Sequence, residues 1–151
     1  MNRSITMKKI TLFHGTSSHS LKKIIKDKGL GSPFLTDDEE IAEYYADCVT
    51  EEHGGDMVIL KITVDIDKLR KDDNSYAEPL TFFRNNFAKS DDEWGEMLTD
   101  GDIPYPSNEN DWRCSLDVVH SVRVDGMVPV NNIEIDYYPG VDIINEPCAI
   151  Y

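Results

Sequence analysis

The apolar and polar positions of this chain recur with two different periods, and these periods predict which segments form strands and which form helices. Residues 58–64 alternate strictly, with four aliphatic side chains on one side, which predicts a half-buried strand. Residues 9–13 alternate in the same manner and are followed by His14-Gly15-Thr16. We therefore expect a short strand that ends there and delivers His14 to a loop.

The segment after this turn has the spacing of an amphipathic helix. Leu21 and Ile24 begin an apolar stripe, and either Ser18 or Ser20 can cap the start of the helix. Gly29 supplies the residue type that most often ends a helix in the left-handed conformation. We expect the lysines of this segment to project from its opposite face.

A second helix is predicted to begin at Thr36, because residues 36–39 have the Thr-x-x-Glu form of a capping box. Its acidic residues lie largely off the apolar stripe. That stripe consists of Ile41, Tyr44, Tyr45 and Cys48. Both tyrosines are therefore expected to point toward packed neighbours.

The second half of the chain has a less regular pattern of apolar and polar positions. Residues 65–89 leave both helix and buried strand open, and residues 90–111 are rich in acids, Gly, Pro and Asn, which predicts a functional or mobile loop. A short helix is expected at 112–118, and strands at 120–125, 132–137 and 141–144. The mixture predicts an α+β protein.

Length and composition predict one domain over residues 1–151, because 151 residues with 40% hydrophobic content support a single core. No apolar run approaches the ~20 residues that a membrane span needs, and the first residues lack the apolar stretch of a secretory signal. We therefore expect a soluble, cytoplasmic protein without membrane contact. A toxin or an effector delivered into another cell would have the same features.

The net charge of the chain limits the classes of partner that it is expected to bind. The chain has 15 Lys and Arg against 29 Asp and Glu, a formal net charge of −14. Such a balance repels phosphate backbones, so general nucleic-acid binding is disfavoured and a protein partner with a basic face is favoured. Three widely spaced cysteines and the absence of histidines at metal-ligand spacing predict neither a disulfide framework nor a metal site.

Three motifs can carry chemistry. The first is a strand ending in His14-Gly15-Thr16, where glycine lets backbone and imidazole approach a ligand together. The second is the extended piece from Phe34 to Thr36, which leads into a helix with Tyr45-Ala46. The third is the strand, Gly turn and proline-led return of residues 121–133.

In this order and spacing, from Leu12 to Ile133, the three motifs resemble the ADP-ribosyltransferase-like superfamily. The resemblance implies an α+β fold with two small splayed β-sheets around a cleft and flanking helices. It also implies a mono-ADP-ribosyltransferase that uses NAD as co-substrate, modifies a macromolecule, with protein the favoured acceptor, and releases nicotinamide.

The resemblance assigns tasks to individual residues. His14, Gly15 and Thr16 correspond to the family's contacts with the nicotinamide ribose and carboxamide, and Tyr45 to the tyrosine that stacks on nicotinamide. Stacking of this kind has a physical basis, because a tyrosine face attracts a cationic ring by ~0.5 to 2 kcal/mol. The remaining cofactor contacts implied are Phe34, Thr36 and, as the alternative to Tyr45, Tyr44.

One departure from the family concerns catalysis. Many transferases carry a glutamate where this chain has Ser121, which would join His14 and Tyr45 as the third catalytic position. Breaking the bond between nicotinamide and ribose develops an oxocarbenium-like sugar that a carboxylate stabilises, whereas a hydroxyl only positions it. Loss of such a group costs ~100- to 1000-fold in rate. Restoring it with Ser121→Glu is expected to raise NAD hydrolysis.

The missing carboxylate leaves several hypotheses open. Glu109, Asp111 or Asp117 could supply it from the acidic loop and the short helix. Alternatively, the chain is a catalytically degenerate acidic binding or inhibitor protein on the same scaffold, or an NAD hydrolase.

Overall fold

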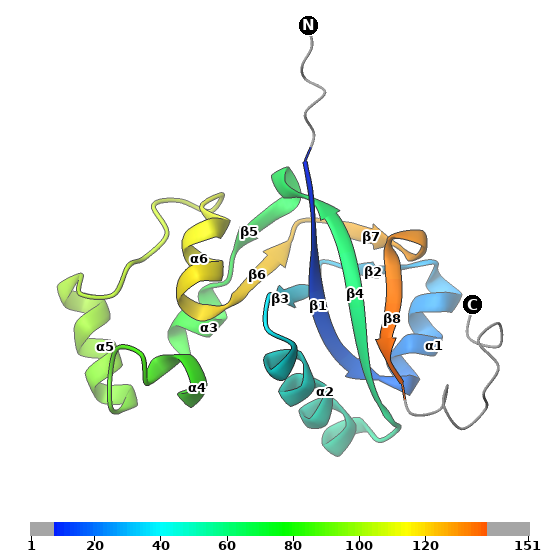
Figure 1. The fold of residues 1–151 in the computed structure, drawn as a ribbon, viewed down its shortest axis with the longest axis horizontal. Coiled ribbons are helices and arrows are strands. Elements are labelled where there is room, and N and C mark those ends of the chain that lie inside the picture. Colours follow the sequence, from blue (N-terminus) through cyan, green and yellow to red (C-terminus); the bar gives the residue numbers. More distant parts are fainter. Residues whose placement is uncertain (1–7, 139–151) are drawn as a thin grey trace, which may run out of the picture.

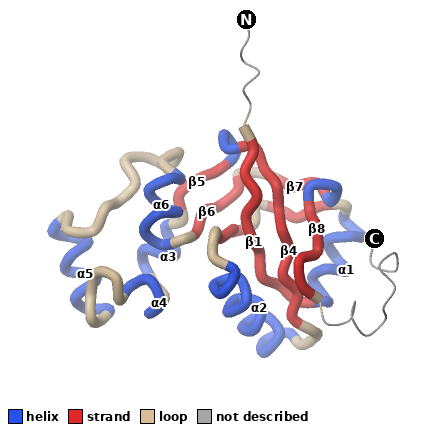
Figure 2. The backbone as a smooth tube through the Cα atoms, viewed as in Figure 1, coloured by secondary structure: helices blue, strands red, loops and turns tan. Residues whose placement is uncertain are grey.

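The computed structural model describes residues 8–138 and has an α+β fold, which confirms the predicted class. A six-stranded antiparallel sheet has the strand order β5-β6-β3-β1-β4-β8, and β2 and β7 form a separate two-stranded ribbon (Figures 1 and 2). The strands are β1 (Lys9–Ser17), β2 (Gly29–Gly31), β3 (Phe34–Thr36), β4 (Met57–Asp65), β5 (Leu69–Lys71), β6 (Ser121–Val124), β7 (Met127–Pro129) and β8 (Ile133–Tyr137). The helices are α1 (Ser18–Asp27), α2 (Glu39–His53), α3 (Asp73–Ala77), α4 (Thr81–Arg84), α5 (Asp91–Asp100) and α6 (Trp112–Val119).

The six-stranded sheet consists of two groups of strands that meet at β3. Strands β1 and β4 pair along their whole lengths, from Lys9 opposite Asp65 to Ser17 opposite Met57. By contrast, β3 pairs with β1 only at Thr36 opposite Phe13, and it pairs with β6 on its other side. The two sheets that we expected to be separate are therefore joined by one narrow contact, and this contact is where a cavity forms.

The predicted end of the first strand is wrong. Strand β1 continues through His14, Gly15 and Thr16 to Ser17, and His14 pairs with Leu60 of β4. The extra length follows from pairing with β4, a long-range contact that local turn propensity does not report. His14 therefore lies on a strand and not in a loop.

The helix termini also differ from the sequence prediction. Ser17 caps α1 by accepting a hydrogen bond from the Ser20 backbone N–H, and Lys28 adopts the left-handed conformation that we had assigned to Gly29. Gly29 instead begins β2, where a Cβ would lie 2.7 Å from the Val128 carbonyl oxygen. A close strand contact, and not a helix stop, therefore requires this glycine.

Helix α2 starts later and faces differently than predicted. Its cap is Asp38, while the Thr36 hydroxyl accepts a hydrogen bond from the Asp38 backbone N–H. The buried face holds Ile41, Ala42 and Ala46. Because alanine is small, the helix backbone packs closely on β1 along this face. The other residues of the expected stripe, Tyr44, Tyr45 and Cys48, therefore lie on the more exposed side of the helix. Tyr44 is 50% exposed, Tyr45 is 38% exposed, and Cys48 is exposed.

The acidic segment 90–111 is not a loop throughout. Helix α5 occupies Asp91–Asp100, with Ser90 as its N-cap and Gly101 in the left-handed conformation at its end. Trp94 anchors the helix, because its indole is buried and its Nε1–H donates to the Tyr76 carbonyl oxygen at 2.9 Å. Tertiary burial of one aromatic residue thus stabilises a helix within an otherwise polar segment.

Two hydrophobic clusters support the fold. One lies between the sheet and α1, and the other packs Ile41 of α2 against the segments from α3 to α6, with Tyr76, Phe83 and Trp94 as its large members. The second cluster holds the connection after β5 against α6. The strand expected at 141–144 lies outside the described residues. No helix in residues 8–138 is long and apolar enough to cross a lipid bilayer.

Candidate functional site

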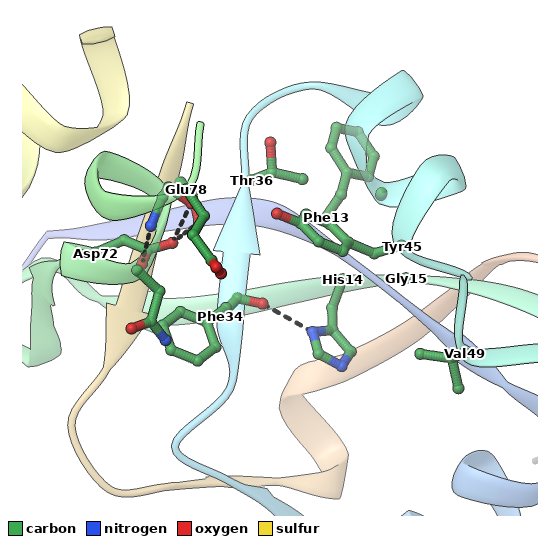
Figure 3. Close-up of a pocket in the computed structure, with 13 residues that line it drawn as sticks. Phe13, His14, Gly15, Phe34, Thr36, Tyr45, Val49, Asp72 and Glu78 are labelled. Carbon is green, nitrogen blue, oxygen red and sulfur yellow. Dashed lines mark hydrogen bonds between the residues drawn. The ribbon is translucent and has the colours of Figure 1, made fainter. Parts of the chain in front are cut away.

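A cavity of about 380 Å³ opens beside the contact between β1 and β3, and we call it the central cavity (Figure 3). Its walls come from β1, β3, α2, the segment from Asp72 to Glu78, and the start of β6. Its size is within the usual range for small-molecule sites. The lining residues are Phe13, His14, Gly15, Phe34, Thr36, Ala42, Tyr45, Val49, Asp72, Asn74, Ser75, Glu78 and Ser121.

Most of the residues that the sequence singled out line this cavity. They are His14, Gly15, Phe34, Thr36, Tyr45 and Ser121. Thr16 is buried in β1 and Tyr44 faces a second groove between α2 and the α4 segment, so neither lines the central cavity. Tyr44 directly precedes Tyr45 on α2, and successive side chains of an α-helix point about 100° apart around its axis.

Gly15 brings two walls of the cavity together. A Cβ at this position would lie only 1.8 Å from the Ala42 carbonyl oxygen and 2.8 Å from the Ala46 backbone nitrogen. The backbone of α2 therefore packs directly on β1, which glycine alone permits. This packing brings Tyr45 of α2 and His14 of β1 into the lining of the same cavity.

His14 has a fixed tautomer and orientation. Its Nδ1 lies 2.8 Å from the Phe34 carbonyl oxygen, and because a carbonyl oxygen only accepts, Nδ1 carries the hydrogen. Burial lowers the pKa of His14, an effect that the hydrogen bond to Phe34 only partly opposes. The imidazole is thus neutral at pH 7, with Nε2 left as an acceptor.

The lowered pKa of His14 predicts a pH dependence of stability. The unfolded chain takes up a proton on this ring near the ordinary pKa of about 6.5, before the folded protein does, so acidification through this range favours unfolding. We expect the free energy of unfolding of the wild type to fall relative to that of His14→Gln as pH decreases from about 7.5 to 5.5.

Denaturant titrations at several pH values measure this difference, and NMR titration of the imidazole reports its pKa directly. A His14 pKa above its ordinary value, or a constant difference between the two proteins, would contradict the prediction.

Tyr45 contributes an aromatic ring to the wall that α2 forms. Burial raises the pKa of its phenol, the nearby charge of Asp72 raises it further, and a hydrogen bond with Ser75 opposes both. The ring keeps enough exposed face to contact a ligand. Figure 3 shows His14, Phe34 and Tyr45 around the same space.

A buried carboxylate that sequence reasoning missed also lines the cavity. Asp72 follows β5, caps α3 and is only 3% exposed. Its Oδ2 accepts hydrogen bonds from the Ser121 hydroxyl at 2.6 Å and the Ser75 hydroxyl at 2.8 Å, and its Oδ1 accepts from the Ser75 backbone N–H at 3.1 Å. The Asp-x-x-Ser pattern of an N-cap is present in the sequence, but it gives no sign of Ser121, which lies 49 positions later.

The carboxylates that the sequence suggested are engaged elsewhere. Glu109 pairs with Arg123 at 3.0 Å, and Asp111 caps α6 and accepts hydrogen bonds from Ser107. Asp117 is exposed on α6. None of the three lines the central cavity.

The charges in the cavity lining favour contact with a cationic group over contact with an anionic one. Among the described residues, no lysine or arginine lines it, whereas Asp72 and Glu78 do. Three aromatic rings, Phe13, Phe34 and Tyr45, add faces that attract cations. Residues 8–138 contain no group of three or more His, Cys, Asp or Glu side chains suited to a metal ion.

The site combines a neutral imidazole, aromatic faces and a held carboxylate in one cavity. Such a set can bind a flat cationic ring and stabilise positive charge that develops beside it. Comparisons of this chain with models of protein families, with curated proteins and with solved structures give no match.

Proposed function

We propose that the protein is an NAD-dependent mono-ADP-ribosyltransferase. The observation that carries the proposal is that six of the eight residues expected to contact NAD or act in catalysis line a single cavity, although they come from β1, β3, α2 and β6. The absence of basic residues among the described lining and the presence of aromatic rings support a pyridinium as the bound group.

The proposed reaction breaks the bond between the ribose C1′ and the nicotinamide nitrogen. The electron pair of that bond leaves with nicotinamide and neutralises its ring, so the positive charge passes to the sugar. A lone pair of the acceptor then forms a bond to C1′, and the acceptor releases a proton. With water as acceptor, the products are ADP-ribose, nicotinamide and a proton.

The cavity residues have separate tasks in this scheme. Tyr45 and Phe34 stack on or beside the pyridinium, and Gly15 lets α2 pack closely enough on β1 to bring Tyr45 into the cavity lining. The neutral His14 adds no positive charge against the bound cation and can accept a ribose hydroxyl hydrogen at Nε2. The acidic surface of the molecule favours encounter with a basic protein acceptor.

Incubation of the pure protein with NAD, followed by measurement of nicotinamide, tests the activity. Time-dependent nicotinamide release that disappears in His14→Ala supports the proposal. Mass spectrometry of a lysate treated with the protein and labelled NAD then identifies ADP-ribosylated proteins. Free ADP-ribose as the sole product would favour an NAD hydrolase, and NAD binding without turnover would favour a degenerate binding protein.

Ligand charge provides a second prediction. 1-Methylnicotinamide differs from nicotinamide by one methyl group on the ring nitrogen, and only the methylated compound is a cation. We expect the cation to bind about tenfold more tightly, because aromatic faces and two carboxylates line the cavity and each contact of this kind favours positive charge by ~0.5 to 2 kcal/mol.

NMR titration with each ligand measures the two dissociation constants, and shifts of the His14 and Tyr45 resonances locate the site. Equal affinity for the two ligands, or shifts confined to other surfaces, would contradict a pyridinium site in the central cavity.

A further inference from the structure

We propose that Asp72 supplies the carboxylate that this chain lacks at position 121, with Ser121 and Ser75 as its positioning residues. The inference rests on the proposed function, since it names the group that stabilises the developing sugar cation. It is drawn from the hydrogen-bond geometry around Asp72 and not from any motif in the sequence.

The carboxylate of Asp72 lies next to the Ser121 side chain of β6. The Ser121 hydroxyl donates to Asp72 Oδ2 at 2.6 Å, and both residues line the central cavity. A glutamate on β6 would have to extend from the Ser121 position toward the same region. Asp72, which directly follows the adjoining strand β5, places its carboxylate within one hydrogen bond of that position.

The surroundings hold Asp72 in one orientation. Its two oxygens accept three hydrogen bonds, two at Oδ2 and one at Oδ1. The Ser115 hydroxyl accepts from the Asp72 backbone N–H at 2.9 Å and donates to the Ser121 carbonyl oxygen at 2.7 Å, so the backbones of both residues are tied to α6. Fixed geometry of this kind is what electrostatic stabilisation of a transition state requires.

One acceptor position of Asp72 remains for a ligand. An ionised carboxylate offers about four lone-pair sites, of which three are used here. The remaining site, on Oδ1, can accept a hydrogen bond from a ribose hydroxyl. As the nicotinamide bond breaks, the negative charge of Asp72 stabilises the positive charge that appears on the ribose.

The other carboxylate in the lining is less suited to this task. Glu78 is exposed beyond the end of α3, and its carboxylate is not held by the hydrogen bonds that fix Asp72. An exposed charge is screened by water and stabilises a cation less effectively than a buried one. Glu78 is therefore assigned to the rim of the cavity.

This arrangement reverses the expectation for Ser121→Glu. A glutamate there would meet the buried Asp72 carboxylate, and two like charges in contact destabilise a buried site. The single variant is therefore expected to unfold at lower denaturant concentration and to release less nicotinamide, not more.

An exchange of the two side chains tests the inference. The single variant Asp72→Ser keeps a residue type that can cap α3. The double variant Asp72→Ser, Ser121→Glu again has one carboxylate and one hydroxyl in this pair, but the carboxylate is now on β6. Asp72→Asn provides a second, shape-matched neutral variant. Asp73→Asn is the matched control, because Asp73 pairs with Lys71 and Tyr105 outside the cavity.

Three readouts are collected for each protein: the kcat of nicotinamide release, the dissociation constant for NAD by calorimetry, and the denaturation midpoint. We expect Asp72→Ser and Asp72→Asn to lower kcat by ~100- to 1000-fold and to weaken NAD binding by no more than about tenfold, because the bound pyridinium loses one of the two carboxylates in the lining. The kcat of the double variant is expected to be at least about tenfold higher than that of Asp72→Ser. A merely structural role would lower the denaturation midpoint in step with kcat, whereas the proposed role lowers kcat in a variant that stays folded and binds NAD.

The outcomes separate the two proposals. A wild type that neither binds NAD nor releases nicotinamide would overturn the proposed function. If the wild type is active, and Asp72→Asn or a folded Asp72→Ser has a kcat close to that of Asp73→Asn, only the role of Asp72 is overturned. A double variant that folds and binds NAD but is no faster than Asp72→Ser would overturn it as well.

Discussion

Replacement of Gly15 by alanine is expected to lower the free energy of unfolding by about 3 kcal/mol or more. The new Cβ would lie 1.8 Å from the Ala42 carbonyl oxygen and 2.8 Å from the Ala46 backbone nitrogen. Both atoms belong to the backbone of α2, so no side-chain rotation relieves the overlap and the helix has to move. Because α2 also carries Tyr45, ligand affinity is expected to fall with stability.

Urea denaturation of the variant measures the effect, and two other glycines serve as controls. A Cβ at Gly31 or at Gly95 would meet no atom within 4 Å. Gly31→Ala is expected to change stability by less than about 1 kcal/mol, and Gly95→Ala to raise it by about 0.5 to 1 kcal/mol, because Gly95 lies in the exposed face of α5. If Gly15→Ala were as stable as Gly31→Ala, the close packing of α2 on β1 would be incorrect.

Removal of the Tyr45 ring is expected to weaken binding of 1-methylnicotinamide by roughly tenfold to a hundredfold. The Tyr45→Ala variant loses both the apolar contact and the cation–π attraction of the ring, which together amount to roughly 1.4 to 2.8 kcal/mol. Tyr45→Phe keeps the ring and is expected to bind within about threefold of the wild type. NMR titration measures all three affinities.

The adjacent tyrosine is the matched control for this experiment. Tyr44 lies on the same helix, and its ring packs edge-on against that of Tyr45 with the ring centroids 5.4 Å apart. The Tyr44 side chain nevertheless faces the second groove. Tyr44→Ala is therefore expected to leave the affinity nearly unchanged. A larger loss in Tyr44→Ala than in Tyr45→Ala would show that the pyridinium binds in the groove between α2 and α4.

Local patterns predicted the regular elements well wherever burial follows a simple period. The alternation at 58–64 predicted β4, and the expected helix at 112–118 agrees with α6. The prediction failed at the end of β1 and at α5, where pairing with β4 and burial of Trp94 outweigh the local turn and loop signals. Close packing against Gly15 also reversed the expected orientation of the tyrosine stripe on α2.

The amino-acid sequence by itself determined the α+β class, the acidic charge and the set of residue types that could bind a cationic ring, because these depend on composition and short-range order. Only the tertiary structure decided that β1 runs past His14, that Tyr45 and not Tyr44 lines the central cavity, and that Asp72 meets Ser121. Each of these depends on contact between segments that are distant in the chain. Close packing and hydrogen bonding across such distances arise when the whole sheet assembles, and no local pattern encodes them.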